Sequence, residues 1–248
     1  MQNIPSWAWP VLAAPFIGSF LGVLVTRLPA GKSPIAGRSC CDQCGHPLSV
    51  VDLIPLVSWL VQRRRCRYCG DVLGAFYPAI ELGALFIALW AATIAEGAML
   101  WISCCLGWCL LALGTIDWND GILPDALTLP LIPLSLAAAF MDDPSSVTGH
   151  AIGAVAGFAS FALIRWLYRR WRGRDGLGFG DVKLLAASGA FVAWDGLPSV
   201  VLIGAATALG LALLTTAGGR KLALDQRVAF GPALCFGTWL VWLYGPLR

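Results

Sequence analysis

The stretch Gly178-Phe179-Gly180-Asp181-Val182-Lys183-Leu184-Leu185 places a carboxylate at the beginning of an otherwise apolar run. A second acid, Asp117, ends another apolar run. Charged side chains near or within lipid are costly, so those that are kept there usually have a function. Two carboxylates at the ends of apolar runs therefore predict a pair that carries out chemistry at one depth of a membrane.

The composition predicts an all-α polytopic membrane protein. Of 248 residues, 58% are hydrophobic and 12% charged, whereas soluble domains average roughly 45–50% apolar and about 25% charged residues. The alternating pattern of a membrane β-barrel is absent, which leaves a helical bundle. We expect about eight transmembrane helices. They run over Trp7–Val25, Ala75–Ala95, Ala98–Ile116, Leu123–Phe140, Val147–Tyr168, Val182–Trp194, Leu197–Thr216 and Ala229–Gly245.

Basic residues predict the orientation of these helices. They cluster in the connections around the first, fifth and seventh apolar runs: Arg27, Lys32, Arg38, Arg63, Arg64, Arg65, Arg67, Arg165, Arg169, Arg170, Arg172, Arg174, Lys183, Arg220, Lys221 and Arg227. With eight spans all of these lie on one side, and only Arg248 lies on the other. The positive-inside rule then places the basic loops in the cytoplasm and both termini outside. Because this role explains the basic residues without a further partner, we expect no nucleic acid to bind the chain. Membrane lipid is expected around the apolar helices.

Three parts follow from the pattern along the chain. Residues 1–26 form a first transmembrane helix, which lacks a preceding basic residue and is expected to remain as an anchor rather than be cleaved as a signal peptide. Residues 27–74 are polar and contain four paired cysteines, which predicts a small cytoplasmic insert. Residues 75–248 form the remaining transmembrane bundle, which contains both acids.

The insert carries two Cys-x-x-Cys pairs, Cys41 with Cys44 and Cys66 with Cys69, each followed directly by glycine. This spacing is typical of knuckle turns that direct two thiolates at one ion, so the four cysteines predict a structural, tetrahedral Zn²⁺ site. A metal supplies folding free energy to a segment too short to build its own core. The alternative is two redox or disulfide pairs, which a reducing cytoplasm disfavours.

Two aspartates can hydrolyse a peptide bond when they share one water. One carboxylate takes a proton from the water, while the other, protonated, polarises the scissile carbonyl; proximity in a low-dielectric site produces this division. Asp120 and Asp125 are alternatives to Asp117, although Asp120-Gly121 is typical of a turn and Asp125 suits the first turn of a helix. The alternative for Asp181 is a helix cap at the end of a flexible loop.

The residues around Asp181 are expected to support it. Gly178 and Gly180 lack a Cβ, so a substrate backbone can approach the carboxylate closely, and they allow conformations that other residues resist. Lys183 either lowers the cost of the charge on Asp181 or extends to the membrane surface.

Several motifs in order resemble one family. They are Gly18-Ser19-Phe20-Leu21 with Arg27-Leu28-Pro29, both cysteine pairs, Tyr77-Pro78 with Glu81, Asp117 with Leu123-Pro124-Asp125, the stretch from Gly178 to Leu184, and Phe230-Gly231-Pro232-Ala233. Together they cover nearly the whole chain. On these residues the chain resembles the type IV prepilin peptidases, bacterial Gly-x-Gly-Asp membrane aspartyl proteases of the inner membrane.

The resemblance implies that Asp117 and Asp181 are the catalytic pair. It implies that the substrates are type IV prepilins and type II secretion pseudopilins, whose short basic leader is removed at the cytoplasmic membrane face. It also implies N-methylation of the new amino terminus with S-adenosylmethionine, an activity associated with the zinc-bearing insert. Glu81 would contribute to substrate or donor binding; the alternative is a helix N-terminal acid.

A function of another class also uses two membrane acids. In a transporter, Asp117 and Asp181 would relay protons or bind cations, and the zinc insert would regulate transport. Transporters often contain inverted repeats and place their ion sites near the bilayer midplane. This chain has no evident repeat, and its acids lie at one surface, so the protease is favoured. A zinc-bearing membrane scaffold without catalysis is the remaining alternative.

Overall fold

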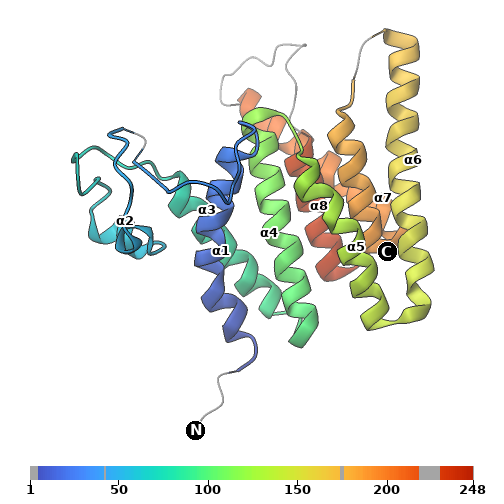
Figure 1. Ribbon diagram of the computed structural model, residues 1–248. Coiled ribbons are helices and arrows are strands. Elements are labelled where there is room, and N and C mark those ends of the chain that lie inside the picture. Colours follow the sequence, from blue (N-terminus) through green and yellow to red (C-terminus); the bar gives the residue numbers. More distant parts are fainter. Residues whose placement is uncertain (1–4, 42, 174–175, 218–229, 248) are drawn as a thin grey trace. The chain divides into compact units, whose positions relative to one another are not determined.

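The computed structural model describes residues 5–41, 43–173, 176–217 and 230–247 (Figure 1). Within these ranges the chain forms helices and two isolated β-bridges but no strand, which confirms the all-α prediction. The elements are α1 (Ala8–Arg27), η1 (Val50–Leu53), α2 (Val57–Val61), α3 (Phe76–Ala92), α4 (Gly97–Asp120), α5 (Asp125–Asp142), η2 (Pro144–Ser146), α6 (Val147–Arg172), α7 (Phe179–Ala217) and α8 (Gly231–Tyr244).

Five helices among the described residues are long and apolar enough to cross a membrane, namely α1, α4, α5, α6 and α7. Helix α3 is apolar but shorter, and α8 has 14 residues. The chain is therefore a membrane protein, although a count of eight transmembrane helices is not confirmed. Some residues used to predict the spans and their orientation lie outside the described ranges: Arg174, Arg220, Lys221, Arg227, Ala229 and Arg248.

Helix α7 contains a break at Ala193, whose φ of 57° and ψ of −176° are not helical. The segment before the break runs parallel to α8 and the segment after it runs antiparallel to α8, so the chain reverses direction there. The packed pairs are Ser188–Thr238 and Phe191–Trp242 before the break, and Val200–Gly237 and Gly204–Leu234 after it. Ala193 lies inside the sixth predicted span, one residue before its end at Trp194 and four residues before the start of the seventh at Leu197.

The chain divides into two compact units, Met1–Ala112 and Leu113–Arg248. In the first unit, α1 packs closely on α3, because a Cβ at Gly18 would lie 2.6 Å from the Cα of Glu81. In the second unit, Gly153 and Gly157 of α6 face the backbone of α7. Small residues let two membrane helices approach closely. The predicted boundaries at residues 27 and 75 stay predictions.

Candidate active site and metal centre

The structure brings Asp117 and Asp181 together within the second unit. Asp117 lies in the last turn of α4 and is only 8% exposed. Asp181 lies in the first turn of α7 and is partly buried. Their two carboxylates are close enough for their like charges to interact. The end of α4 and the start of α7 therefore each contribute one acid to the same site.

The first turn of α8 holds the carboxylate of Asp117. The backbone N–H of Gly231 donates a hydrogen bond to Asp117 Oδ2 at 3.1 Å. A helix N-terminus favours negative charge, so the end of α8 stabilises the ionised form of this side chain. A Cβ at residue 231 would lie 2.5 Å from the same oxygen. A side chain at residue 231 would therefore displace the Asp117 carboxylate from this position.

Gly178 and Gly180 also make room for the chain's own atoms. The backbone N–H of Gly178 hydrogen-bonds to the carboxylate of Asp181, and a Cβ at residue 178 would lie 3.0 Å from Asp181 Oδ2. A Cβ at residue 180 would lie 2.8 Å from the Cβ of Leu123. The close approach of a substrate to these glycines stays a prediction, because the packing alone accounts for both residues.

The other two candidate acids, Asp120 at the end of α4 and Asp125 at the start of α5, have different surroundings from Asp117. Asp120 is exposed at the end of α4, and Gly121 follows it with a φ of 67°, as the predicted turn requires. Asp125 begins α5 and binds Lys183 of α7, with Nζ–Oδ1 and Nζ–Oδ2 distances of 2.6 and 2.8 Å. Lys183 therefore places its charge on Asp125. Of these three acids, Asp117 is the buried one.

The four paired cysteines form a metal-binding geometry in the first unit. The Sγ atoms of Cys41, Cys44, Cys66 and Cys69 all lie within 4.8 Å of one another. Four sulfurs at about 2.3 Å from a tetrahedral zinc are about 3.8 Å apart, so these residues fit the ion after a small contraction. The glycines after the two pairs have φ values of 68° and 75°. The backbone N–H of each glycine donates a hydrogen bond to the backbone carbonyl oxygen of the first cysteine of its own pair at 2.9 Å.

Charge explains why this cluster needs a cation. The backbone N–H groups of Cys69 and Tyr68 lower the pKa of Cys66 to about 7. The N–H of Asp71 acts in the same direction on Cys69, but burial and the neighbouring thiols raise the pKa of Cys69 to about 12. Four thiols this close to one another cannot all lose their protons unless a cation balances the negative charge. Binding a divalent metal therefore releases protons, and its affinity falls as the pH is lowered.

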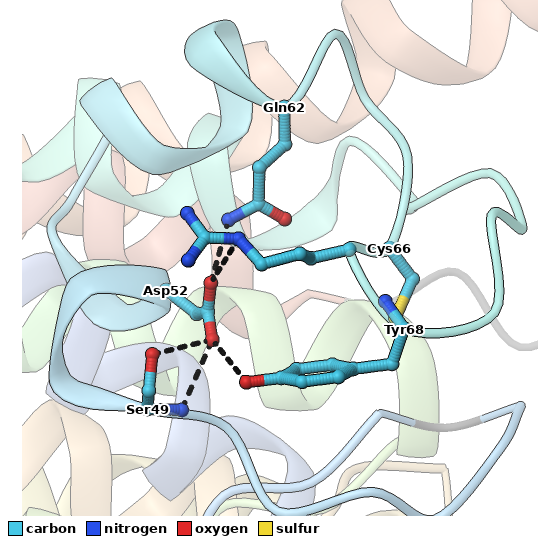
Figure 2. A network of polar contacts seen from close by, with 6 residues as sticks. Ser49, Asp52, Gln62, Cys66 and Tyr68 are labelled. Carbon is cyan, nitrogen blue, oxygen red and sulfur yellow. Dashed lines mark hydrogen bonds and ion pairs between the residues drawn. The ribbon is translucent and has the colours of Figure 1, made fainter.

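Asp52 connects the metal cluster to the η1–α2 segment (Figure 2). Its side chain is 2% exposed. Its carboxylate accepts hydrogen bonds from the Ser49 hydroxyl (2.6 Å) and amide (3.1 Å), from Gln62 (3.0 Å) and from the Tyr68 hydroxyl (3.2 Å), and it pairs with Arg67 at 3.5 Å. The Ser49 hydroxyl is the main group that lowers the pKa of Asp52. The Ser49–Asp52 spacing of a capping box was the available sequence signal.

Glu81 joins three segments of the first unit. It is 5% exposed, and its Oε2 accepts a hydrogen bond from the backbone N–H of Leu56 at 2.8 Å. The hydroxyl of Ser19 in α1 also hydrogen-bonds to it. Leu56 has a φ of 59°, which is uncommon for a residue with a side chain, and this bond helps to hold it. Glu81 lies beyond the first turn of α3, so it is not a helix N-terminal acid.

The segments that carry these residues match known proteins. Residues 12–95 match the model of the bacterial peptidase A24 N-terminal domain, and residues 104–213 match that of the type IV leader peptidase family. A Burkholderia pseudomallei (strain 1026b) protein named prepilin leader peptidase/N-methyltransferase is 38% identical over 259 residues, which cover 93% of this chain and 82% of the relative. The chain belongs to the type IV leader peptidase family.

Other relatives in this family carry the same name. The Aeromonas hydrophila protein is 36% identical over 92% of this chain and 87% of its own length, and the Pseudomonas aeruginosa protein is 32% identical over 95% and 89%. No solved structure gives a significant match to the chain. These findings confirm the resemblance to the prepilin peptidases, and they give no support to a transporter.

We expect this family member to bind about one zinc per chain through its four paired thiolates. Cys44→Ser and Cys69→Ser, one in each pair, should both lose the metal, because an incomplete tetrathiolate binds zinc far more weakly. Cys40→Ser is the matched control, since Cys40 is also exposed but is not one of the four clustered residues. Metal analysis of the purified protein provides the measurement. A folded wild type without metal would contradict the zinc site.

The ion pair between Asp125 and Lys183 should have only a small effect on the rate of leader cleavage, and the two residues should act together. The Asp125 side chain is 54% exposed, and exposed ion pairs contribute at most about 1 kcal/mol. Lys183→Met and Asp125→Asn should therefore each slow leader cleavage by less than about tenfold, since tenfold corresponds to about 1.4 kcal/mol. The double variant should be no slower than either single variant. If Lys183 acted directly on Asp181, Lys183→Met would slow the Asp125→Asn enzyme further.

Proposed function

We propose that this protein is a membrane-embedded aspartic endopeptidase that removes the leader peptide of type IV prepilins and type II secretion pseudopilins, and that it also N-methylates the new amino terminus. The observation that carries the proposal is the buried Asp117 beside Asp181, each on a helix end within one compact unit. The names of the relatives supply the prepilin substrate and the second activity.

In the proposed reaction, the two carboxyl groups hold one proton between them, since two interacting like charges in a partly buried site disfavour double ionisation. The ionised carboxylate takes a proton from a water molecule as the water oxygen attacks the scissile carbonyl carbon. The protonated carboxyl donates to the carbonyl oxygen. The C–N bond then breaks: the amine leaves with the proton taken from water, and the hydroxyl formed on the carbonyl oxygen returns its proton to the carboxylate that donated it, which restores the pair. The Gly231 amide would stabilise the ionised form of Asp117, and the Gly178 amide would do the same for Asp181, so either acid could be the ionised one.

We propose that both acids face the cytoplasm, at the inner membrane of a bacterium. The last turn of α6, which precedes the Asp181 loop, carries Arg169, Arg170 and Arg172, and basic residues mark the cytoplasmic side of a membrane protein. With the eight spans expected from the sequence, both chain termini would lie outside. The basic leader of a prepilin would remain in the cytoplasm while its hydrophobic helix lies in lipid. Its scissile bond would therefore reach the membrane surface near the acids.

The proposed methyl donor is S-adenosylmethionine, while zinc would have a structural role in the insert of residues 27–74. Zinc fits the four clustered thiols. No set of residues fits the methyl donor in the same way. The resemblance connects Glu81 with donor or substrate binding, but its buried carboxylate accepts hydrogen bonds from Leu56 and Ser19. We therefore assign the donor to no residue and propose Glu81 as a positioning residue of the first unit.

The deciding experiment incubates the detergent-purified, zinc-loaded protein with a prepilin and a methyl-labelled donor. Release of the leader, followed by mass spectrometry, tests the peptidase, and label on the new amino terminus tests the methyltransferase. A transporter would instead move protons or cations across proteoliposomes without a prepilin. Failure to cut any prepilin while catalysing such a flux would overturn the proposal.

A further inference from the structure

The insert presents an unusual apolar surface. Between Val50 and Val61, which cover η1 and α2, seven large apolar side chains are exposed: Val50, Val51, Leu53, Ile54, Val57, Leu60 and Val61. Val50 is 83% exposed, Leu60 65% and Val61 72%. So many exposed apolar side chains in one short segment are unfavourable in water and indicate contact with a membrane or a partner. We call residues 50–61 the apolar flap.

The flap is held at the depth of the membrane helices. The N–H of Leu56, within the flap, binds the carboxylate of Glu81, and the backbone of Glu81 touches Gly18 of α1. Gly18 is nine residues from the end of α1 at Arg27 (27 − 18), which is about 14 Å along a helix. Figure 1 shows α2 level with the middle of α1. Both α1 and α3 are apolar helices, and a membrane that α1 spans would place lipid acyl chains at this level.

Charge next to the flap fits a lipid headgroup region. Four exposed arginines follow α2: Arg63, Arg64, Arg65 and Arg67. The guanidinium of Arg64 lies over the ring of Trp59 at 5.3 Å. Tryptophan is enriched at membrane interfaces, and arginine is attracted to the anionic phosphates of the cytoplasmic leaflet. Apolar side chains with a tryptophan and a basic cluster beside them are typical of segments that lie in the interface.

We propose that the apolar flap inserts between the acyl chains of the adjoining leaflet, while Arg63, Arg64 and Arg65 bind its anionic headgroups. The Asp52 network joins the flap to Tyr68 between the second pair of cysteines, so the metal cluster and the membrane surface hold the insert together. The insert is thus a membrane-docked element beside α1 and α3. This inference rests on the chain being a membrane protein and does not depend on peptidase activity.

A fluorescence experiment on the full zinc-loaded chain in nanodiscs of anionic lipid tests the docking. An environment-sensitive fluorescent amino acid replaces Leu60 in one variant and Ile35 in another. Ile35 is the matched control because it is apolar and 87% exposed in the same insert, but it adjoins Ala36, which is bound by the guanidinium of Arg27 at the end of α1. We expect lipids with a spin label on the acyl chain to quench position 60 several-fold more than position 35, and iodide in the water to show the reverse order.

Two further measurements keep the result decisive. The fluorophore at Val61 repeats the test if the Leu60 variant does not bind zinc, and Arg63→Gln with Arg64→Gln and Arg65→Gln should reduce acyl-chain quenching at the flap in anionic lipid. Equal quenching at positions 60 and 35 would overturn the proposal. The proposal would also be overturned if iodide quenched the flap in nanodiscs and only an added prepilin protected it. The flap would then be a binding surface for the substrate.

Discussion

Asp117→Asn and Asp181→Asn are each expected to abolish leader cleavage. Asparagine has nearly the same shape as aspartate, so the packing around α4 and α7 should survive. It cannot exchange a proton, however, so neither variant can both activate the water and protonate the carbonyl. Loss of a positioned acid or base typically costs 10²–10⁴-fold, and loss of a shared-proton pair should lie at about the upper end of this range. Single-turnover cleavage of a purified prepilin measures the effect.

Asp120→Asn is the matched control for this prediction. Asp120 lies three residues from Asp117 on the same helix but is exposed, so its removal should leave cleavage nearly unchanged. Zinc content and helical circular dichroism should be unchanged in all three variants, since the metal cluster lies in the other compact unit. Full activity of Asp117→Asn would show that another acid acts with Asp181.

The helices could be predicted from hydropathy, but their ends could not. The fifth predicted span ended at Tyr168, whereas α6 continues to Arg172 and stops at Gly173 with a φ of 68°. Hydropathy detects the lipid-facing part of a helix, while backbone hydrogen bonding continues through arginines, which are good helix formers. In contrast, the prediction of separate sixth and seventh spans agrees with the break in α7 at Ala193. The contact that α6 makes with α7 near this break could not be predicted. His150 of α6 donates a hydrogen bond to the carbonyl oxygen of Ala190 at 2.7 Å.

The chemistry of the site was visible in the sequence, whereas its supports were not. Cysteine spacing indicated the metal cluster, and acids at the ends of apolar runs indicated the pair. The hydrogen bond from Gly231 to Asp117 joins residues 114 positions apart, and the bond from Lys183 to Asp125 spans 58. No local pattern reports such partners. Gly231 was noticed only through a family resemblance, and its role follows from the atom that a Cβ would meet.

Gly231→Ala is the second prediction with a large effect, and it should slow leader cleavage strongly. The new methyl group would lie 2.5 Å from Asp117 Oδ2, so the carboxylate must turn away and lose its hydrogen bond to the N–H at residue 231. Hydrogen bonds to charged groups contribute about 1.5–3 kcal/mol. Because about 1.4 kcal/mol corresponds to tenfold in rate, we expect a loss of about 10- to 100-fold in the chemical step.

Gly114→Ala provides the matched control for this second effect. Gly114 lies one turn before Asp117 on α4 and also faces α8, but a Cβ there would meet Pro232 at 3.5 Å, an ordinary van der Waals distance. This variant should fold and cut at nearly the wild-type rate. Substrate affinity should change little in either variant, so the loss in Gly231→Ala should appear in kcat rather than in KM. Equal rates for the two variants would show that the first turn of α8 does not position the carboxylate of Asp117 for catalysis.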